Sequence, residues 1–179
     1  MSETEELDAG GFSAWLTEIQ GAIRGDNSSN VACGTCTACC TSSQFIHIGP
    51  EETDTLSHIP AAVVFPATRM PKGHMLMGYN QHGHCPMLID NQCSIYQHRP
   101  RACRTYDCRV FPATGVPADD DKPLIAAQAV RWRFSYASDQ ARDAHAALVE
   151  AAAGDSESVN ATQRAVKAVR RASSEIREH

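Results

Sequence analysis

The chain has 179 residues, of which 42% are hydrophobic, and it carries a formal net charge of −5. This length allows one domain with its own hydrophobic core and room for a helical extension. The acidic balance argues against nucleic acid as the main partner, because phosphate binding leaves a basic surface, and no apolar stretch has the length that a membrane span requires.

The N-terminal residues 1–11 are predicted to be a disordered acidic tail. The chain starts with Met1-Ser2-Glu3-Thr4-Glu5-Glu6, which lacks the basic start and apolar run of an export signal, so we expect a cytoplasmic protein. The next apolar residues recur at helical spacing and predict about three turns of amphipathic helix that end at Gly25; these residues are Phe12, Trp15, Leu16, Ile19 and Ile23.

The middle of the chain predicts short strands, turns and short helices. Residues 45–48 have the pattern of a strand, and the Gly-Pro-Glu-Glu sequence at 49–52 is typical of a helix start. The segment 75–79 predicts a second strand between proline- and glycine-rich turns. Two apolar runs flank Asp90-Asn91-Gln92 and predict a tight hairpin, and Arg99-Pro100 predicts the start of another short helix.

The C-terminal third is predicted to be helical after a loop over residues 115–123. From Leu124 onwards, Ile125, Ala129, Trp132 and Tyr136 share one helical face, and an alanine-rich continuation reaches Ala153. The last segment has apolar or small residues at alternating steps of three and four, namely Val159, Thr162, Val166, Val169, Ser173 and Ile176. This seam is short and contains two hydroxyl residues, so we expect it to pack against its own domain rather than to form a coiled-coil dimer.

All eight cysteines lie between residues 33 and 108, in two groups of four. The first group is Cys33, Cys36, Cys39 and Cys40, and the second is Cys85, Cys93, Cys103 and Cys108. In a reducing compartment such dense cysteines are more often metal ligands than disulfides. Zinc and iron are bound by thiolates in tetrahedral geometry, so four sulfurs must converge on one centre.

The spacing leaves both the metal and the number of centres open. A C-x2-C-x2-C run such as Cys33 to Cys39 can supply three corners of a cubane iron–sulfur cluster (4Fe-4S), with a remote fourth cysteine, whereas eight thiolates also suit two four-cysteine zinc sites. The adjacent Cys39 and Cys40 are harder to place on a single ion, because neighbouring side chains tend to point apart. We therefore expect either that the pair serves two centres or that one of the two supports a ligand without binding the metal. The arginines near the second group favour thiolate over thiol if they lie close to the sulfurs; these are Arg99, Arg101, Arg104 and Arg109. The nearby histidines, His74, His82, His84 and His98, are expected to be polar loop residues rather than ligands.

These motifs together resemble the CxxCxxCC cysteine-cluster family of zinc- or iron-chelating proteins, whose module also occurs in bacterial flagellin lysine N-methylase. The likeness rests on the first cysteine run, on Cys85-Pro86-Met87-Leu88, and on the segment from Cys93 to Arg104. It implies that Tyr96, Arg99 and Pro100 form a helix start that positions Cys103. It also implies a ligand set of Cys33, Cys36, Cys39, Cys40, Cys85, Cys93 and Cys103. Cys108 is added on local spacing alone, since Asp107 stands where an apolar residue or proline is expected.

The sequence therefore predicts an α+β protein with a small cysteine-rich metal-binding core of short strands and a hairpin, flanked by amphipathic helices. The expected boundaries are residues 12–115 for the cysteine-cluster domain with its N-terminal helix, and 124–179 for a helical extension that could carry a protein partner. The predicted function is metal binding, by zinc or an iron–sulfur cluster, with a structural, electron-transfer or sensing role. A metal-dependent enzyme, or an accessory subunit of one, is the alternative, and thiol redox chemistry at Cys33 and Cys36 is a third interpretation.

Overall fold

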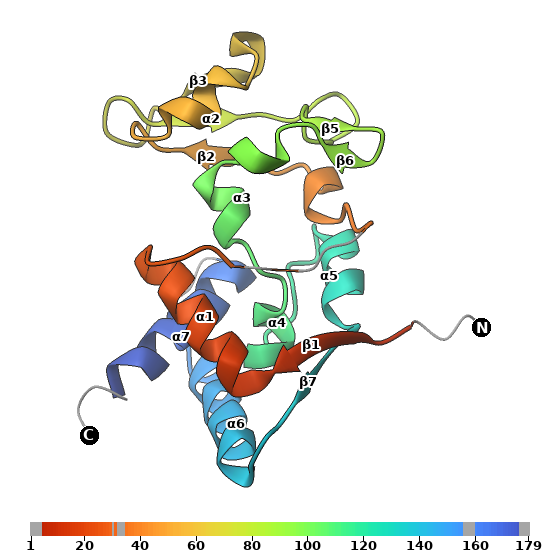
Figure 1. Cartoon of the computed structure of the whole chain (residues 1–179), viewed down its shortest axis with the longest axis vertical. Coiled ribbons are helices and arrows are strands. Elements are labelled where there is room, and N and C mark those ends of the chain that lie inside the picture. Colours follow the sequence, from red (N-terminus) through yellow and green to blue (C-terminus); the bar gives the residue numbers. More distant parts are fainter. Residues whose placement is uncertain (1–4, 30, 32–34, 156–159, 176–179) are drawn as a thin grey trace. The chain divides into compact units, whose positions relative to one another are not determined.

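The computed structural model describes residues 5–29, 31, 35–155 and 160–175, and within these the chain divides into two units (Figure 1). Unit 1 is built from both ends of the chain, residues 1–29 and 107–179, and unit 2 is the intervening segment 30–106. Helices and small sheets occur together in the described residues, which confirms the predicted α+β class.

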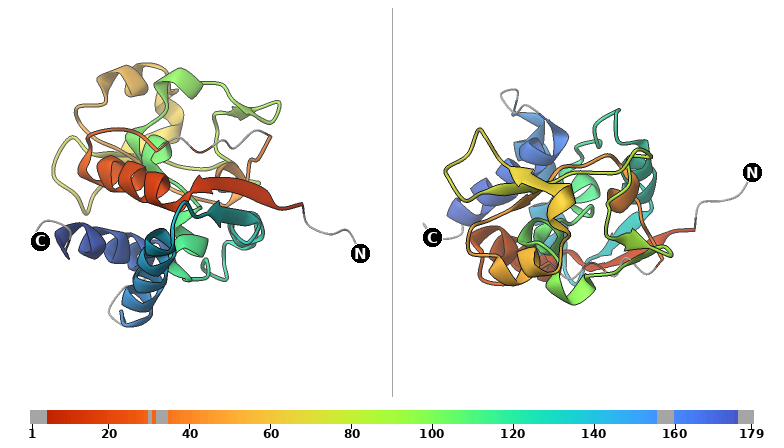
Figure 2. Two further views of the ribbon diagram at one scale, coloured as in Figure 1. Left: turned by 60° about the horizontal axis from the view of Figure 1, so that its bottom comes forward. Right: turned by 90° about the horizontal axis from the view of Figure 1, so that it is seen from above.

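Unit 1 contains a pair of parallel strands and most of the helical residues. Its elements in chain order are β1 (Leu7–Gly11), α1 (Phe12–Arg24), α4 (Val110–Thr114), α5 (Pro123–Ala129), β7 (Trp132–Ser135), α6 (Asp139–Ala153) and α7 (Ala161–Glu175). Strand β1 lies alongside β7 (Figure 2), with Leu7 opposite Trp132 and an irregularity between Asp8 and Gly10. The predicted N-terminal helix is confirmed as α1, and it ends at Gly25, whose φ of 92° is a conformation that glycine adopts without strain.

The core of unit 1 combines aromatic rings with alanine-rich helices. Phe12 of α1 stacks on His145 of α6 with ring centroids 4.4 Å apart, and Phe134 of β7 meets Phe12 edge-on at 5.5 Å. Helix α7 contributes small residues that are almost completely buried, Ala165, Ala168 and Val169, and it packs against α1, α4 and α6. Small side chains let helix backbones approach closely, so the C-terminal helix packs on its own unit, as predicted. Its buried face differs from the predicted seam, because Thr162 and Val166 are only partly buried, while Val159 and Ile176 lie outside the described residues.

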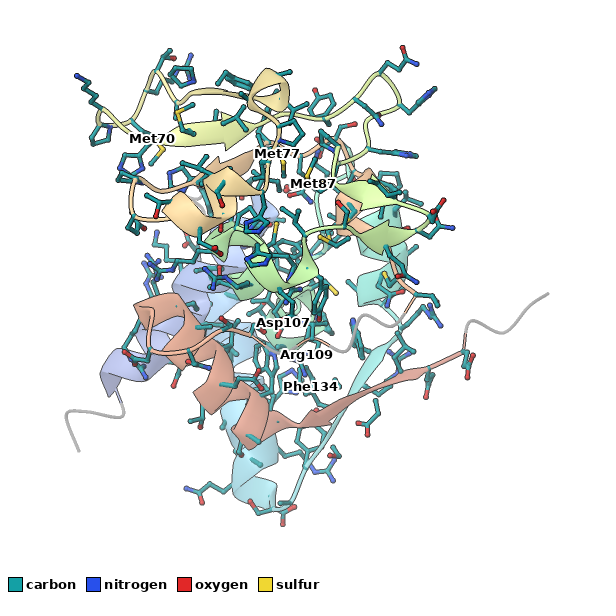
Figure 3. The ribbon with its side chains drawn as sticks, turned by 45° about the horizontal axis from the view of Figure 1, so that its top comes forward. Met70, Met77, Met87, Asp107, Arg109 and Phe134 are labelled. Carbon is teal, nitrogen blue, oxygen red and sulfur yellow. The ribbon has the colours of Figure 1, made fainter. Side chains whose placement is uncertain are left out.

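Unit 2 consists of short elements around a small core. They are η1 (Cys39–Thr41), β2 (Ile46–Ile48), α2 (Thr53–Ser57), η2 (Ala61–Val63), β3 (Val64–Pro66), β4 (Met75–Met77), β5 (Leu88–Ile89), β6 (Gln92–Cys93), η3 (Tyr96–His98) and α3 (Arg101–Thr105). Strands β2, β4 and β3 form an antiparallel sheet in that order. The buried cluster consists of Ile48, Ile59, Met77, Met87 and Ile95. Its two methionines are labelled in Figure 3.

The predicted hairpin is confirmed as β5 and β6, which pair Leu88 with Cys93. Asp90 and Asn91 occupy the turn with φ values of 50° and 59°. Two successive positive φ angles are what a two-residue hairpin with the normal strand twist requires, and Asp and Asn tolerate them better than most residues.

Two sequence predictions for the ends of the chain are wrong. Residues 7–11 are not part of a disordered tail, because they form β1 and hydrogen-bond to β7. The continuous helix expected from Leu124 to Ala153 is interrupted by β7, so Trp132 lies on a strand and not on a helical face. Helix α1 also groups with the C-terminal helices rather than with the cysteine segment, so the units differ from the predicted 12–115 and 124–179 division.

Among the helices of the described residues, none combines the length and the apolar character needed to cross a membrane.

Candidate metal centre

Four cysteines of unit 2 come from four separate segments of the chain. Cys39 lies in the turn η1, Cys85 precedes the hairpin, Cys93 ends β6, and Cys103 lies in the middle of α3. The N–H of Cys85 donates a hydrogen bond of 2.7 Å to the carbonyl of Cys40, which joins the first cysteine group to the hairpin segment.

Local hydrogen bonds fix the backbone around Cys39 and at Cys103. Thr41 closes the η1 turn by donating from both its N–H and its hydroxyl to the carbonyl of Thr37, at 3.0 Å each. In α3 the N–H of Cys103 donates to the carbonyl of Pro100 at 2.9 Å. Pro100 precedes this helix without needing a hydrogen-bond partner for its nitrogen, as the sequence predicted for this signature.

The thiols of these four cysteines influence one another electrostatically. Burial, together with negative charge at Cys85, Cys39 and Cys93, raises the pKa of Cys103 from 9.0 to about 12. Burial, followed by charge at Cys93 and Cys39, also raises the pKa of Cys85. Cys103 therefore lies within electrostatic range of the other three thiols in a partly buried region, where burial keeps Cys85 and Cys103 in the neutral thiol form in the absence of a cation.

The neighbouring Cys39 and Cys40 interact directly. Their sulfur atoms are 4.0 Å apart, and this hydrogen bond is the main reason why the pKa of Cys39 is raised far above its ordinary value, with burial second. The Cys40 sulfur therefore lies beside that of Cys39, one of the four cysteines, without belonging to the four itself. None of the seven described cysteines forms a disulfide.

The chemistry of this donor set fits a zinc or iron centre. A metal cation next to the four sulfurs would replace mutual repulsion by attraction and bring the thiols to the thiolate form that binds zinc and iron. Arg99, through its positive charge, lowers the pKa of Cys103 and partly opposes the effect of burial. Its guanidinium lies 3.7 Å from the centre of the Tyr96 ring, and its Nε donates to the Tyr96 carbonyl at 2.9 Å, so the predicted helix-start signature also holds a positive charge near the sulfurs.

The other predicted ligands are placed differently. Cys36 is partly buried in unit 2, and Cys33 lies outside the described residues. Cys108 belongs to unit 1, where its sulfur accepts a hydrogen bond of 3.2 Å from Nε1 of Trp132. The predicted role of Cys108 as a ligand stays a prediction.

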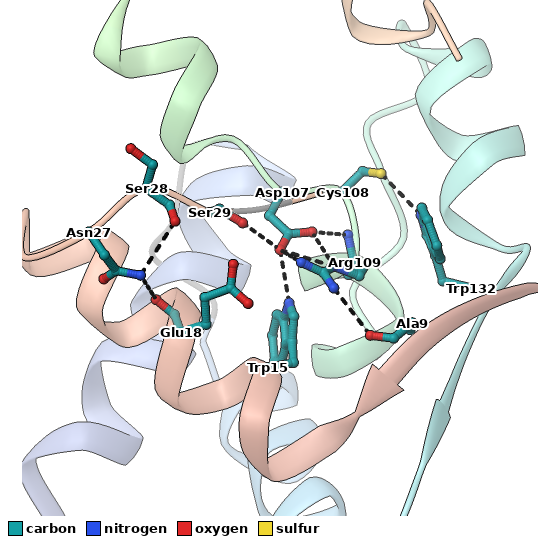
Figure 4. Close-up of polar contacts among 10 residues, drawn as sticks. All are labelled: Ala9, Trp15, Glu18, Asn27, Ser28, Ser29, Asp107, Cys108, Arg109 and Trp132. Atoms are coloured by element: carbon teal, nitrogen blue, oxygen red, sulfur yellow. Dashed lines mark hydrogen bonds and ion pairs between the residues drawn. The ribbon is translucent and has the colours of Figure 1, made fainter. Parts of the chain in front are cut away.

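Asp107, next to Cys108, is the centre of a buried polar network in unit 1 (Figure 4). Its carboxylate side chain has no exposed surface and accepts hydrogen bonds from Trp15 Nε1 at 2.9 Å and from the Ser29 hydroxyl at 2.8 Å. It also forms an ion pair with Arg109, whose Nη2 lies 2.8 Å from Oδ2. Arg109 in turn donates to the carbonyl of Ala9 in β1 at 3.2 Å. Asp107 therefore connects α1 and, through Arg109, β1 to the segment that follows unit 2. This role explains why a charged residue stands where an apolar one was expected. Arg109 is the ion-pair partner within this network.

The histidines of unit 2 form pairs that the sequence did not predict. His47 and His74 are joined by a hydrogen bond of 2.8 Å between ring nitrogens. His98 lies 2.7 Å from the Asp54 carboxylate, and His58 stacks on His98. The spacing of Asp54 and His58, four residues apart at a helix end, is the one sequence signal for this cluster.

Comparison with known protein families decides what this cysteine arrangement is. The family model CxxCxxCC, described as a putative zinc- or iron-chelating domain, matches residues 32–130, which is more than half of the chain. The chain belongs to the CxxCxxCC family. The CxxCxxCC match includes all of the clustered cysteines and continues through α4 and α5 of unit 1. Neither the curated proteins nor the solved structures that were compared with the chain include a match.

Proposed function

We propose that unit 2 chelates a metal through Cys39, Cys85, Cys93 and Cys103, and that this centre holds the unit in its folded form. The observation that supports this proposal is that thiols from four different segments come close enough for Cys39 and Cys93 to raise the pKa of Cys85, and for all three to raise the pKa of Cys103. Metal binding to such a set contributes directly to folding, because the unfolded chain does not hold the four sulfurs together.

The small size of the hydrophobic core in unit 2 supports a structural role. Five buried side chains form its centre, and Cys85 and Cys93 pack against them. Units of this size with short strands and helices often need a metal or a disulfide in addition to their core. A centre next to Cys85 and Cys93 would therefore fix the hairpin and α3 to the existing core.

Electron transfer or sensing is the second candidate function. It is favoured by the first cysteine group, because Cys36 and Cys39 belong to a C-x2-C-x2-C run typical of iron–sulfur ligands. An iron–sulfur cluster would supply one-electron chemistry, whereas zinc would supply none. The same proposal places the protein in the cytoplasm, where thiols stay reduced.

The test is metal analysis of protein purified without oxygen, combined with its visible absorption spectrum. We expect zinc or iron in the wild-type protein; iron with acid-labile sulfide and a broad visible band would favour electron transfer or sensing, and zinc without visible absorption would favour the structural role. Cys39→Ser and Cys103→Ser are expected to lose the metal and to melt at a lower temperature.

Cys108→Ser is the matched control, because it removes one thiol from unit 1 and leaves the four proposed ligands intact. We expect it to keep its metal. Full metal content and unchanged melting in both Cys39→Ser and Cys103→Ser would refute the proposal, and metal loss in Cys108→Ser would refute the set of four.

A further inference from the structure

A second group of potential metal ligands on unit 2 contains no cysteine. It consists of Asp54 in α2, His58 directly after α2, and His98 at the end of η3. One potential ligand atom from each residue lies within 4.8 Å of the others. The two imidazole rings stack with their centroids 3.6 Å apart and their planes 9° from parallel.

Hydrogen bonds to Asp54 determine which ring nitrogens carry protons. Nδ1 of His58 lies 2.9 Å from the backbone carbonyl of Asp54, and a carbonyl can only accept, so this nitrogen carries the hydrogen. Nδ1 of His98 lies 2.7 Å from the Asp54 carboxylate, which is ionised because the hydrogen bond with His98 lowers the pKa of Asp54. The proton of each neutral ring is therefore on Nδ1, and Nε2 of each ring holds a lone pair.

This arrangement has the form of a ligand pair with an orienting carboxylate. Metal-binding histidines usually donate their second ring nitrogen to a carboxylate or carbonyl, which fixes the ring and makes the free nitrogen a better ligand. Here one residue, Asp54, supplies both acceptors. No hydrogen bond to Nε2 of His58 or His98 is formed by the part of the chain that the structure describes.

We propose that His58 and His98 bind one divalent first-row transition-metal ion through their Nε2 atoms, with Asp54 as the residue that positions both rings. Imidazole nitrogen suits zinc, nickel and copper, whereas magnesium and calcium prefer oxygen ligands. Two protein nitrogens leave further coordination positions to water, so this site binds its ion exchangeably rather than as a closed structural centre.

The ion cannot bind to the rings while they remain stacked. A metal lies close to the plane of an imidazole that it binds, so two nearly parallel rings must splay apart before both lone pairs can reach one ion. The side chains of His58 and His98 are 39% and 38% exposed, so solvent leaves them space for this rotation. Binding therefore changes the environment of both rings.

The test is titration of the full, metal-loaded protein with Ni²⁺, in which binding is measured by calorimetry and the histidine rings are observed by nitrogen NMR. We expect one Ni²⁺ to bind without release of the metal already held, with changes at Nε2 of His58 and His98. The variants His58→Gln and His98→Gln should each lose this binding step, and Asp54→Asn should weaken it by about 10- to 100-fold.

The variant His47→Gln/His74→Gln is the matched control, because it removes a hydrogen-bonded histidine pair from the same unit. It should bind Ni²⁺ as the wild-type protein does. The proposal is overturned if the wild-type protein takes up no Ni²⁺, or if the His58 and His98 variants bind it unchanged. Because the cysteine ligands stay intact in all these variants, the result is independent of the function proposed for the cysteine centre.

Discussion

Replacement of Asp107 by alanine tests the interpretation of the buried network in unit 1. The substitution removes the acceptor for the Arg109 guanidinium, of whose side chain only 10% is exposed, and for the buried indole N–H of Trp15. A buried charge that loses its partner costs about 3–5 kcal/mol, and an unsatisfied buried N–H adds about 1–3 kcal/mol. Since such effects overlap, we expect the free energy of unfolding of unit 1 to fall by about 4–6 kcal/mol, which is comparable with the whole stability of many domains.

Urea denaturation followed by tryptophan fluorescence measures this effect. The only two tryptophans of the chain, Trp15 and Trp132, both belong to unit 1, so the signal reports on that unit. The double variant Asp107→Ala/Arg109→Met removes the stranded charge together with its partner and should be more stable than Asp107→Ala alone. A loss below about 1 kcal/mol in Asp107→Ala, which is the range of exposed ion pairs, or a double variant that is no more stable, would refute the reasoning.

Three further predictions concern single positions. Gly115→Ala should lower stability by about 1–2 kcal/mol in thermal melts, because Gly115 has a φ of 67° and an added Cβ would lie 3.0 Å from the Val149 side chain. Gly154→Ala is the control and should be close to neutral, because Gly154 has a φ of −75°. Tyr136→Phe removes the 2.6 Å hydrogen bond to Nδ1 of His145 and should cost about 1 kcal/mol in urea denaturation, and an unchanged midpoint would contradict this. In metal-free protein the folded state keeps the proton of Cys103 until about pH 12, whereas the unfolded chain loses it from about pH 9. The free energy of unfolding should therefore be independent of this thiol's titration below pH 9 and fall by up to about 1.4 kcal/mol per pH unit above it. An equal slope in Cys103→Ser would show that this thiol is not responsible.

The elements that depend on local signals were predictable from the sequence. Helix α1 follows from the spacing of its aromatic and aliphatic residues, and the hairpin follows from Asp90-Asn91 between two apolar runs. Strand β7 was missed because Trp132 fits the helical spacing of the residues before it, although Arg131 to Phe134 also alternates between polar and apolar residues. Its partner β1 is a short segment with two glycines at the other end of the chain, and pairing over such a sequence distance leaves no local signal.

The metal centre was predictable in composition but only partly in arrangement. The spacing of the cysteines indicated two groups of four, whereas the electrostatic contacts connect Cys39 of the first group to Cys85, Cys93 and Cys103 of the second. This grouping depends on how the hairpin and α3 pack on the core, which cysteine spacing does not encode. Asp54 and His98 meet for the same reason, since 44 positions separate them in the chain.

The bond between the Ser29 hydroxyl and the Asp107 carboxylate joins the last residue before unit 2 to the first residue after it. The two places where the chain leaves and re-enters unit 1 are thus fixed side by side, and unit 2 is an insertion between them. Such a junction could be bridged by a few residues, as in proteins that accept inserted domains at neighbouring surface positions. Unit 2 therefore has the connectivity of an inserted domain, and we expect a chain in which a short glycine-rich bridge replaces residues 30–106 to retain the hydrogen bonds of Asp107 to Trp15 and Ser29.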